Sequence, residues 1–155
     1  FKLPIEIEIA LAIFIFLSVF MGRAKEFYFK FWWWDIALHS GSAIILGFIG
    51  FTIIYLMYSA HKIKAKPITL AVFSLFFAMA IGAIWEVFEF FMDQVFGLQM
   101  QDNSLTDTMS DLIVDGIGAI FASTIGFFYF KSTKVPPFQR MINRIRKNNP
   151  KLFKN

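Results

Sequence analysis

Seven of the eleven acidic residues of this 155-residue chain lie between Lys66 and Lys131, a stretch that contains no Lys or Arg. Within its apolar segment "AIGAIWEVFEFFMDQVFG", Glu86, Glu89 and Asp93 are spaced i, i+3 and i+7, so a helix would carry them on one stripe. Carboxylates in apolar surroundings need a neutralising partner, which can be a proton, a bound divalent cation or a Lys or Arg from another segment.

Two further polar stripes have helical spacing. Asp107, Asp111 and Asp115 are at i, i+4 and i+8, and Asp35 and His39 are at i, i+4. A His beside several carboxylates suits Zn²⁺ or Mn²⁺, whereas carboxylates alone suit Mg²⁺ or Ca²⁺. The three stripes together therefore predict a divalent-metal site.

The predicted roles divide between metal binding and acid–base chemistry. Asp93 and Asp35 are the candidate catalytic residues, as general bases toward a metal-activated water. A simpler interpretation also stays open, because Asp93 and Asp107 can be hydrated among the headgroups, Asp107 can favour a helix N-terminus, and His39 can be a packing residue. The candidate metal ligands are His39, Glu86, Glu89, Asp107, Asp111 and Asp115. The candidate caps of the helix that contains Asp107 are Asn103, Ser104 and Thr106.

The helices that carry these stripes are expected to span a membrane. The chain is 57% apolar and 19% aromatic, above the roughly 45–50% apolar content of a soluble domain. A bilayer core needs about 20 apolar helical residues, and the windows 36–58, 68–96 and 112–130 qualify. The shorter window 5–21 is interpreted as a fourth span. The predicted fold is all-α, a polytopic bundle of about four transmembrane helices.

Basic residues predict the orientation of the bundle in the plasma (inner) membrane. The 61–66 loop holds three Lys, and the segment from residue 131 to the end holds eight Lys or Arg, so both are expected to be cytoplasmic. The aromatic stretch 27–34 is expected at the outer interface. Counting about 20 residues from the cytoplasmic ends brings all three polar stripes to one height, the outer edge of the bilayer.

The C-terminal segment is predicted to be a separate region. Residues 1–131 form the expected transmembrane domain, and 132–155 form a basic cytoplasmic tail. Its apolar residues are spaced as one face of a helix, which favours a basic amphipathic helix on the anionic cytoplasmic leaflet, with no role in nucleic-acid binding. The apolar residues of that face are Phe138, Met141, Ile142 and Ile145.

Three motifs in order, "DIALHS", "IWEVFEFFMD" and "MQDNSLTDTMSDLIVDGIGA", make residues 32–125 resemble the YjdF-like prokaryotic membrane proteins and, more distantly, the VanZ-like family. VanZ-like proteins are linked to glycopeptide (teicoplanin) resistance, so this resemblance implies a place in the cell envelope. The family's motif positions would be carried by Asp35, His39, Glu86, Glu89, Asp93, Asp107, Thr108, Asp111, Asp115 and Gly118.

The leading functional hypothesis is an envelope membrane protein whose outward-facing metal site acts on a membrane lipid or lipid-linked headgroup, as a metal-dependent hydrolase or transferase. One alternative is a proton- or ion-coupled transporter or channel subunit, in which buried carboxylates load and release ions. Because the inner halves of the predicted spans are apolar, a transport path would need a homo-oligomer. The other alternative is a non-catalytic membrane assembly protein.

Overall fold

The chain folds into helices, and the computed structural model describes residues 5–101, 104–132 and 136–150. No strand occurs among these residues. The helices are α1 (Ile5–Ile15), which continues as the π-helix η1 (Phe16–Ala24), α2 (Phe27–Lys30), α3 (Trp34–Ser59), α4 (Pro67–Phe96), α5 (Leu105–Ser132) and α6 (Pro136–Asn148). By length and composition, α1 with η1, α3, α4 and α5 can each cross a membrane, which confirms the predicted all-α polytopic fold.

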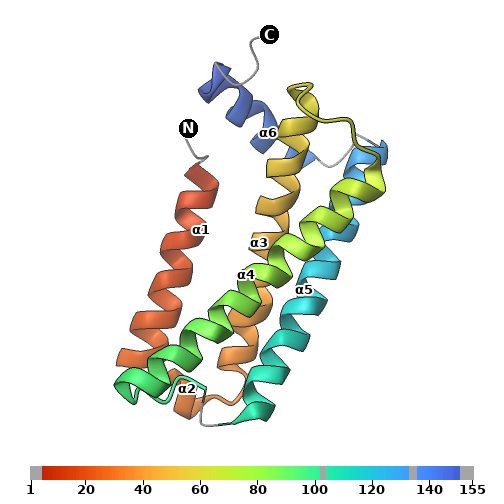
Figure 1. Cartoon of the computed structure of the whole chain (residues 1–155). Coiled ribbons are helices and arrows are strands. Elements are labelled where there is room, and N and C mark those ends of the chain that lie inside the picture. The colour runs from red at the N-terminus through yellow and green to blue at the C-terminus, as the bar shows by residue number, and fades with distance from the viewer. Residues whose placement is uncertain (1–4, 102–103, 133–135, 151–155) are drawn as a thin grey trace.

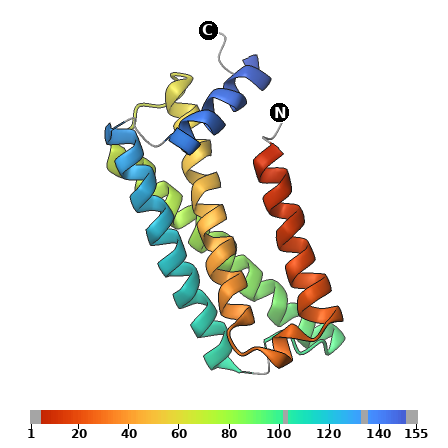
Figure 2. The ribbon, with the colours of Figure 1, turned by 180° about the vertical axis from the view of Figure 1, so that it is seen from behind.

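The helices α3, α4 and α5 pack together as a bundle, and α1 stands beside it (Figures 1 and 2). No residue of α1 is buried, and Gly22 is the only buried residue of η1. An apolar groove between this first span and α3 is lined by Ala10, Phe14, Leu38 and Gly41, among others. The first span therefore borders the bundle without contributing to its core.

Small residues allow the three bundle helices to approach closely. A Cβ atom on Gly118 would lie 2.9 Å from both the Ala43 Cβ and the Ser40 carbonyl oxygen, so a larger residue there would force α5 away from α3. The buried Ser74 hydroxyl donates to the Gly47 carbonyl oxygen at 2.6 Å and links α4 to α3. Close backbone approach in this bundle brings together the faces that carry the polar stripes.

The two ends of the bundle differ in character. The connection between α3 and α4, the helix α6 and the beginning of α1 lie at one end, while α2, the end of α4 and the beginning of α5 lie at the other (Figure 1). At the first end, Phe51, Leu70 and Tyr129 form an apolar core cluster with Ile142 and Ile145 of α6. The bundle is therefore apolar at this end, and the acidic stripes are at the opposite end.

The C-terminal helix α6 packs against the bundle through part of its apolar face. Ile142 and Ile145 are fully buried, and Arg144 forms an ion pair with Glu6 of α1. Sequence analysis expected this face to lie on the anionic leaflet, but these two residues contact protein. Binding of the leaflet by the basic residues of α6 stays a prediction, as does the domain boundary at 131/132.

Candidate functional site

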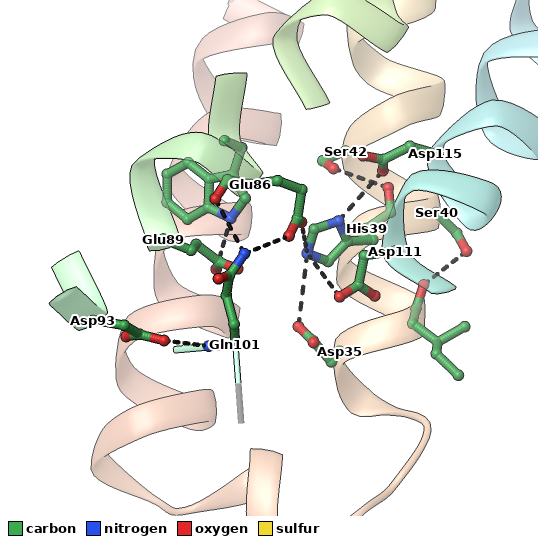
Figure 3. A network of polar contacts seen from close by, with 12 residues as sticks. Asp35, His39, Ser40, Ser42, Glu86, Glu89, Asp93, Gln101, Asp111 and Asp115 are labelled. Atoms are coloured by element: carbon green, nitrogen blue, oxygen red, sulfur yellow. Dashed lines mark hydrogen bonds and ion pairs between the residues drawn. The ribbon is translucent and has the colours of Figure 1, made fainter. Parts of the chain in front are cut away.

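The candidate site is a buried cluster around the imidazole of His39, at the end of the bundle that contains α2 (Figure 3). Its Nε2 atom lies 3.9 Å from Asp35 Oδ1, 3.9 Å from Glu86 Oε1 and 4.0 Å from Asp111 Oδ2. Its Nδ1 atom lies 3.4 Å from Asp115 Oδ1. One imidazole on α3 therefore faces four carboxylates from three helices, as the coincidence of the three stripes predicted.

The packing face of α4 carries its two carboxylates into this cluster. The buried residues of this helix recur three or four apart, from Ala71 and Ser74 through Ala78 and Gly82 to Glu86 and Glu89. Because Glu86 continues a stripe of small buried residues, its side chain points at α3 and α5, not at lipid. The same periodicity on α5 buries Asp111 and Asp115, which are both 2% exposed.

Three carboxylate oxygens in the cluster lack a hydrogen-bond donor. Glu86 Oε1, Asp111 Oδ2 and Asp115 Oδ1 are buried and have no hydrogen-bond partner, although all three face the His39 ring. Buried polar atoms are nearly always paired, and an unpaired one costs about 1–3 kcal/mol. A proton or a bound cation would satisfy these three oxygens.

Glu89 occupies the edge of the cluster and is held by an indole on its own helix. Trp85 Nε1 donates to Glu89 Oε1 at 2.8 Å, and Glu89 can share an ion with His39 and Glu86. This contact was not predicted from the sequence, although Trp85 and Glu89 are at i and i+4, the spacing at which side chains of a helix are neighbours.

Tyr28 of α2 is a second residue that the sequence analysis did not single out. Its ring packs against Gly22, where a Cβ atom would meet the ring at 2.3 Å. Burial, together with the negative charges of Asp35 and Glu89, raises the pKa of Tyr28 to about 12. Tyr28 is therefore a neutral phenol at physiological pH, and it lies within electrostatic range of two carboxylates of the site.

Asp93 binds the loop that follows α4. Its two carboxylate oxygens accept the Met100 N–H at 2.6 Å and the Gln101 N–H at 2.9 Å. The loop leaves the helix at Gly97, whose φ of 66° is the left-handed conformation that glycine adopts readily. The fold thus gives Asp93 a definite structural contact, while its predicted role as a general base stays a prediction.

The loop held by Asp93 places Gln101 over the cluster. Gln101 Nε2 lies 3.2 Å from both the Glu86 carbonyl oxygen and Glu86 Oε2, and it donates to each (Figure 3). The contact with Oε2 leaves Oε1 directed at His39. Nothing in the sequence pattern reveals this contact, because a loop residue has no periodicity that predicts its direction.

Replacing Asp93 with Asn is expected to loosen this loop. The amide keeps one acceptor oxygen and loses the charge, and hydrogen bonds to charged groups contribute about 1.5–3 kcal/mol each. Amide exchange at Met100 and Gln101, measured by hydrogen–deuterium exchange, should accelerate about tenfold or more. The control Glu26→Gln removes an exposed carboxylate just before α2, at the same end of the bundle (Figure 1), and should leave both rates unchanged. Unchanged exchange rates in Asp93→Asn would show that the Asp93 carboxylate does not hold the loop.

Of the predicted metal ligands, Asp107 and Asp115 belong to neither of the two metal-ligand groups that can be drawn around His39 among the described residues. These groups contain Asp35 and Asp111 in one case and Glu86 and Glu89 in the other, with their candidate ligand atoms within 4.8 Å of one another. Asp107 instead lines a polar pocket of about 270 Å³ between the beginnings of α3 and α5, which Asp35 and Asp111 also line. Its own N–H donates to Ser104 Oγ at 3.3 Å, so Ser104 is the cap of α5.

Within the described residues, no Lys or Arg pairs with Glu86, Glu89, Asp111 or Asp115. In the segment between η1 and α3, Lys30 Nζ donates to the Lys25 carbonyl oxygen at 2.8 Å and lies 3.5 Å from Glu26 Oε2. Lys25 Nζ lies over the Phe20 ring. Among the described residues, no ion pair joins a Lys or Arg to these four carboxylates, so a proton and a divalent cation are the neutralising partners to test.

The donor set and spacing suit a metal with mixed nitrogen and oxygen ligands. Two ligands that share a tetrahedral Zn²⁺ at about 2.1 Å lie about 3.4 Å apart. The distances from His39 Nε2 to its carboxylate oxygens are 3.9–4.0 Å, so a shift of roughly half an ångström would bring these atoms to coordination distance. The roles of individual residues as ligands stay a prediction.

Comparison with known proteins gives one family. Residues 1–132 match the family model described as "Predicted membrane protein (DUF2238)", the family of the YjdF-like proteins. Searches of curated proteins and of solved structures give no match. The matched region includes all four candidate spans and every residue of the cluster, and it ends with α5. The chain therefore belongs to the predicted membrane protein family DUF2238.

Proposed function

We propose that this protein is a multi-pass membrane protein of the cell envelope whose buried cluster holds a divalent cation and acts on the headgroup of a lipid or lipid-linked molecule. The observation that carries the proposal is the set of three buried carboxylate oxygens around His39 without hydrogen-bond donors. Imidazole with carboxylates favours Zn²⁺ or Mn²⁺ over Mg²⁺ or Ca²⁺. Such a cation would polarise a phosphoryl oxygen and activate water, the chemistry of a hydrolase or transferase.

The surroundings of the cluster support a substrate at the membrane surface. The polar pocket opens beside it, and the aromatic residues Phe31, Trp33 and Trp34 pack together just before and at the start of α3, as in an interfacial belt. Asp35 lines the pocket, its side chain is 35% exposed, and it lies beside His39, so it is the better placed of the two candidate bases. The basic loops favour the outer leaflet as the location of the site.

The transport alternative has less support from a single copy of the chain. Beyond the cluster, the hydroxyls of Thr52, Ser74 and Ser123 each donate to a backbone carbonyl oxygen. They border an apolar core that contains Phe51 and Leu70. Hydroxyls engaged in this way, next to an apolar core, do not form a polar path toward the other end of the bundle.

Elemental analysis of the purified protein tests the metal. The wild type is expected to contain about one Zn²⁺ or Mn²⁺ per chain, and Glu86→Gln and Asp111→Asn are expected to lower that content at least tenfold, because each removes a ligand charge. Glu26→Gln, an exposed carboxylate outside the cluster, is the control and should retain the metal. A wild type without stoichiometric metal would contradict the proposal and leave protons as the neutralising partner.

Action on a headgroup has its own test. Metal-loaded protein incubated with an envelope lipid extract should release or transfer a headgroup, detected by mass spectrometry of the lipids. Asp35→Asn should abolish that turnover, and the metal content of the same sample separates the loss of a base from the loss of a ligand. Turnover in the wild type that is unchanged in Asp35→Asn, Glu86→Gln and Asp111→Asn would exclude this site as its source.

A further inference from the structure

The polar pocket beside the cluster has the size of a small ligand group. Its volume of about 270 Å³ is close to the lower limit of about 300 Å³ for small-molecule pockets. Residues at the beginning of α3 form one wall, and the first two turns of α5 form the other. The pocket therefore fits a headgroup, not a whole lipid.

The walls of this pocket select for positive charge. Asp35, Asp107 and Asp111 line it together with three hydroxyl side chains, and none of its lining residues is Lys or Arg. A phosphate alone would meet only carboxylates and hydroxyls on these walls. An ammonium group would have both opposite charge and hydrogen-bond acceptors around it.

An aromatic ring completes the pocket. Trp32 lines it and is 82% exposed, so its indole face is accessible to a ligand. Tryptophan is the strongest aromatic partner of cations, and aromatic rings with acidic groups are the common recognition device for substituted ammonium ions. A carboxylate wall facing an indole is therefore a site for an organic ammonium ion.

Asp111 joins this pocket to the His39 cluster. It lines the pocket, is 2% exposed, and its unpartnered Oδ2 lies 4.0 Å from His39 Nε2. A ligand with its ammonium group in the pocket would therefore extend its next group toward the proposed cation. In ethanolamine- and choline-type headgroups that next group is a phosphate, the group that a divalent cation binds.

From this arrangement we infer that the polar pocket binds the ammonium group of an ethanolamine- or choline-type molecule and directs its phosphate toward the His39 cluster. The binding of the ammonium group needs only the pocket, whereas the direction of the phosphate rests on the proposed metal site. The inference thus names a substrate class, zwitterionic phosphate esters with an ammonium end.

Native mass spectrometry of the full chain in detergent tests the binding. The protein is given an equal mixture of short-chain phosphatidylethanolamine and phosphatidylglycerol with identical acyl chains. The wild type should retain the ethanolamine lipid about fivefold or more over the glycerol lipid, in line with a cation–π contact and a carboxylate partner. Asp107→Asn and Trp32→Leu should each bring the ratio close to unity.

Matched controls separate the pocket from general effects of charge and aromatic content. Glu26→Gln removes an exposed carboxylate, and Trp33→Leu removes a neighbouring indole, and neither residue lines the pocket. Both should keep the preference. A wild-type ratio near unity, or a preference that persists in both Asp107→Asn and Trp32→Leu, would overturn the inference.

Two further measurements on the same samples assign the source of the ammonium group and keep the two proposals apart. Free ethanolamine and choline that displace the lipid would identify a soluble amine as sufficient, whereas no displacement at millimolar concentration would identify the lipid headgroup. Metal content should be unchanged in Trp32→Leu. A wild-type protein that prefers the ethanolamine lipid but contains no metal would contradict the proposed function and leave this inference intact. A wild-type protein that contains metal but shows no lipid preference would overturn this inference and leave the proposed function intact.

Discussion

A His39→Gln variant is expected to bind the proposed metal about 100-fold more weakly than the wild type. His39 Nε2 lies within 4.0 Å of carboxylate oxygens of Asp35, Glu86 and Asp111, so it is the nitrogen donor with which these three groups could share a metal. A carboxamide is a poor ligand for Zn²⁺ compared with imidazole, so the carboxylates would have to bind without their nitrogen donor. The measurement is a metal-competition titration of purified protein.

The second histidine of the chain provides the matched control for this experiment. His61 follows α3 at the opposite end, is exposed and lies outside the cluster. His61→Gln makes the same chemical change and should leave metal affinity within a factor of about two, as expected for an exposed site far from the ion. A His39→Gln protein that binds metal as tightly as His61→Gln would show that the ion binds outside this cluster.

Replacing Gly82 with Ala is expected to damage the cluster through packing alone. The added Cβ would lie 2.2 Å from Asp115 Oδ2 and 3.1 Å from its Cγ, so either the carboxylate or α4 must move. Asp115 Oδ1 is 3.4 Å from His39 Nδ1, and displacement of Asp115 would break this contact. Overpacking typically costs about 1–3 kcal/mol, and we expect that loss of unfolding free energy together with weaker metal binding.

Gly41 is the control for Gly82 because its added Cβ would meet nothing within 4 Å. Gly41→Ala should leave metal binding unchanged and stabilise α3 by up to about 1 kcal/mol, since alanine has the higher helix propensity. Thermal unfolding in detergent and metal titration of both variants provide the comparison. Equal behaviour of the two alanine variants would contradict the close packing of α4 against Asp115.

The polar stripes were predictable because helical spacing is a local property of the sequence. Asp35 and His39, Glu86 and Glu89, and Asp111 and Asp115 were each paired by spacing, and depth counting brought them to one height. The structure brings these six residues together. The residues meet at one level because a straight helix has a fixed rise per residue, so positions counted from neighbouring helix ends lie at similar heights.

The environment of Asp93 and Gln101 could not be predicted in this way. Asp93 continues the stripe of Glu86 and Glu89 in the sequence, but its partners are two loop amides, which helical periodicity does not describe. The direction of the loop depends on the left-handed turn at Gly97 and on a positive φ at Gln99. A glycine can adopt either sign of φ and a positive φ is uncommon at other residues, so the sequence does not indicate these two conformations.

The partner of α6 also lay beyond the reach of pattern analysis. An apolar face on a basic helix can pack on a bilayer or on protein, because both remove the same side chains from water. The helix was predicted from the spacing of Ile142 and Ile145, but their burial against Phe51 and Tyr129 depends on where α3 and α5 end. The amphipathic pattern therefore predicts that the apolar face of α6 is removed from water, but it does not say whether lipid or protein covers that face.

The distribution of the cluster over α3, α4 and α5 bears on how the chain enters the membrane. Synthesis proceeds from the N-terminus, so the helix with His39 is in place before the helices with Glu86 and Asp111 arrive. An acidic side chain costs about 2.5–3.5 kcal/mol at the centre of a helix that inserts alone, and less near the edge of the bilayer, where these residues are expected. During biogenesis, each acidic helix can dock on an imidazole that is already present, so the order of the stripes along the chain lowers the cost of insertion.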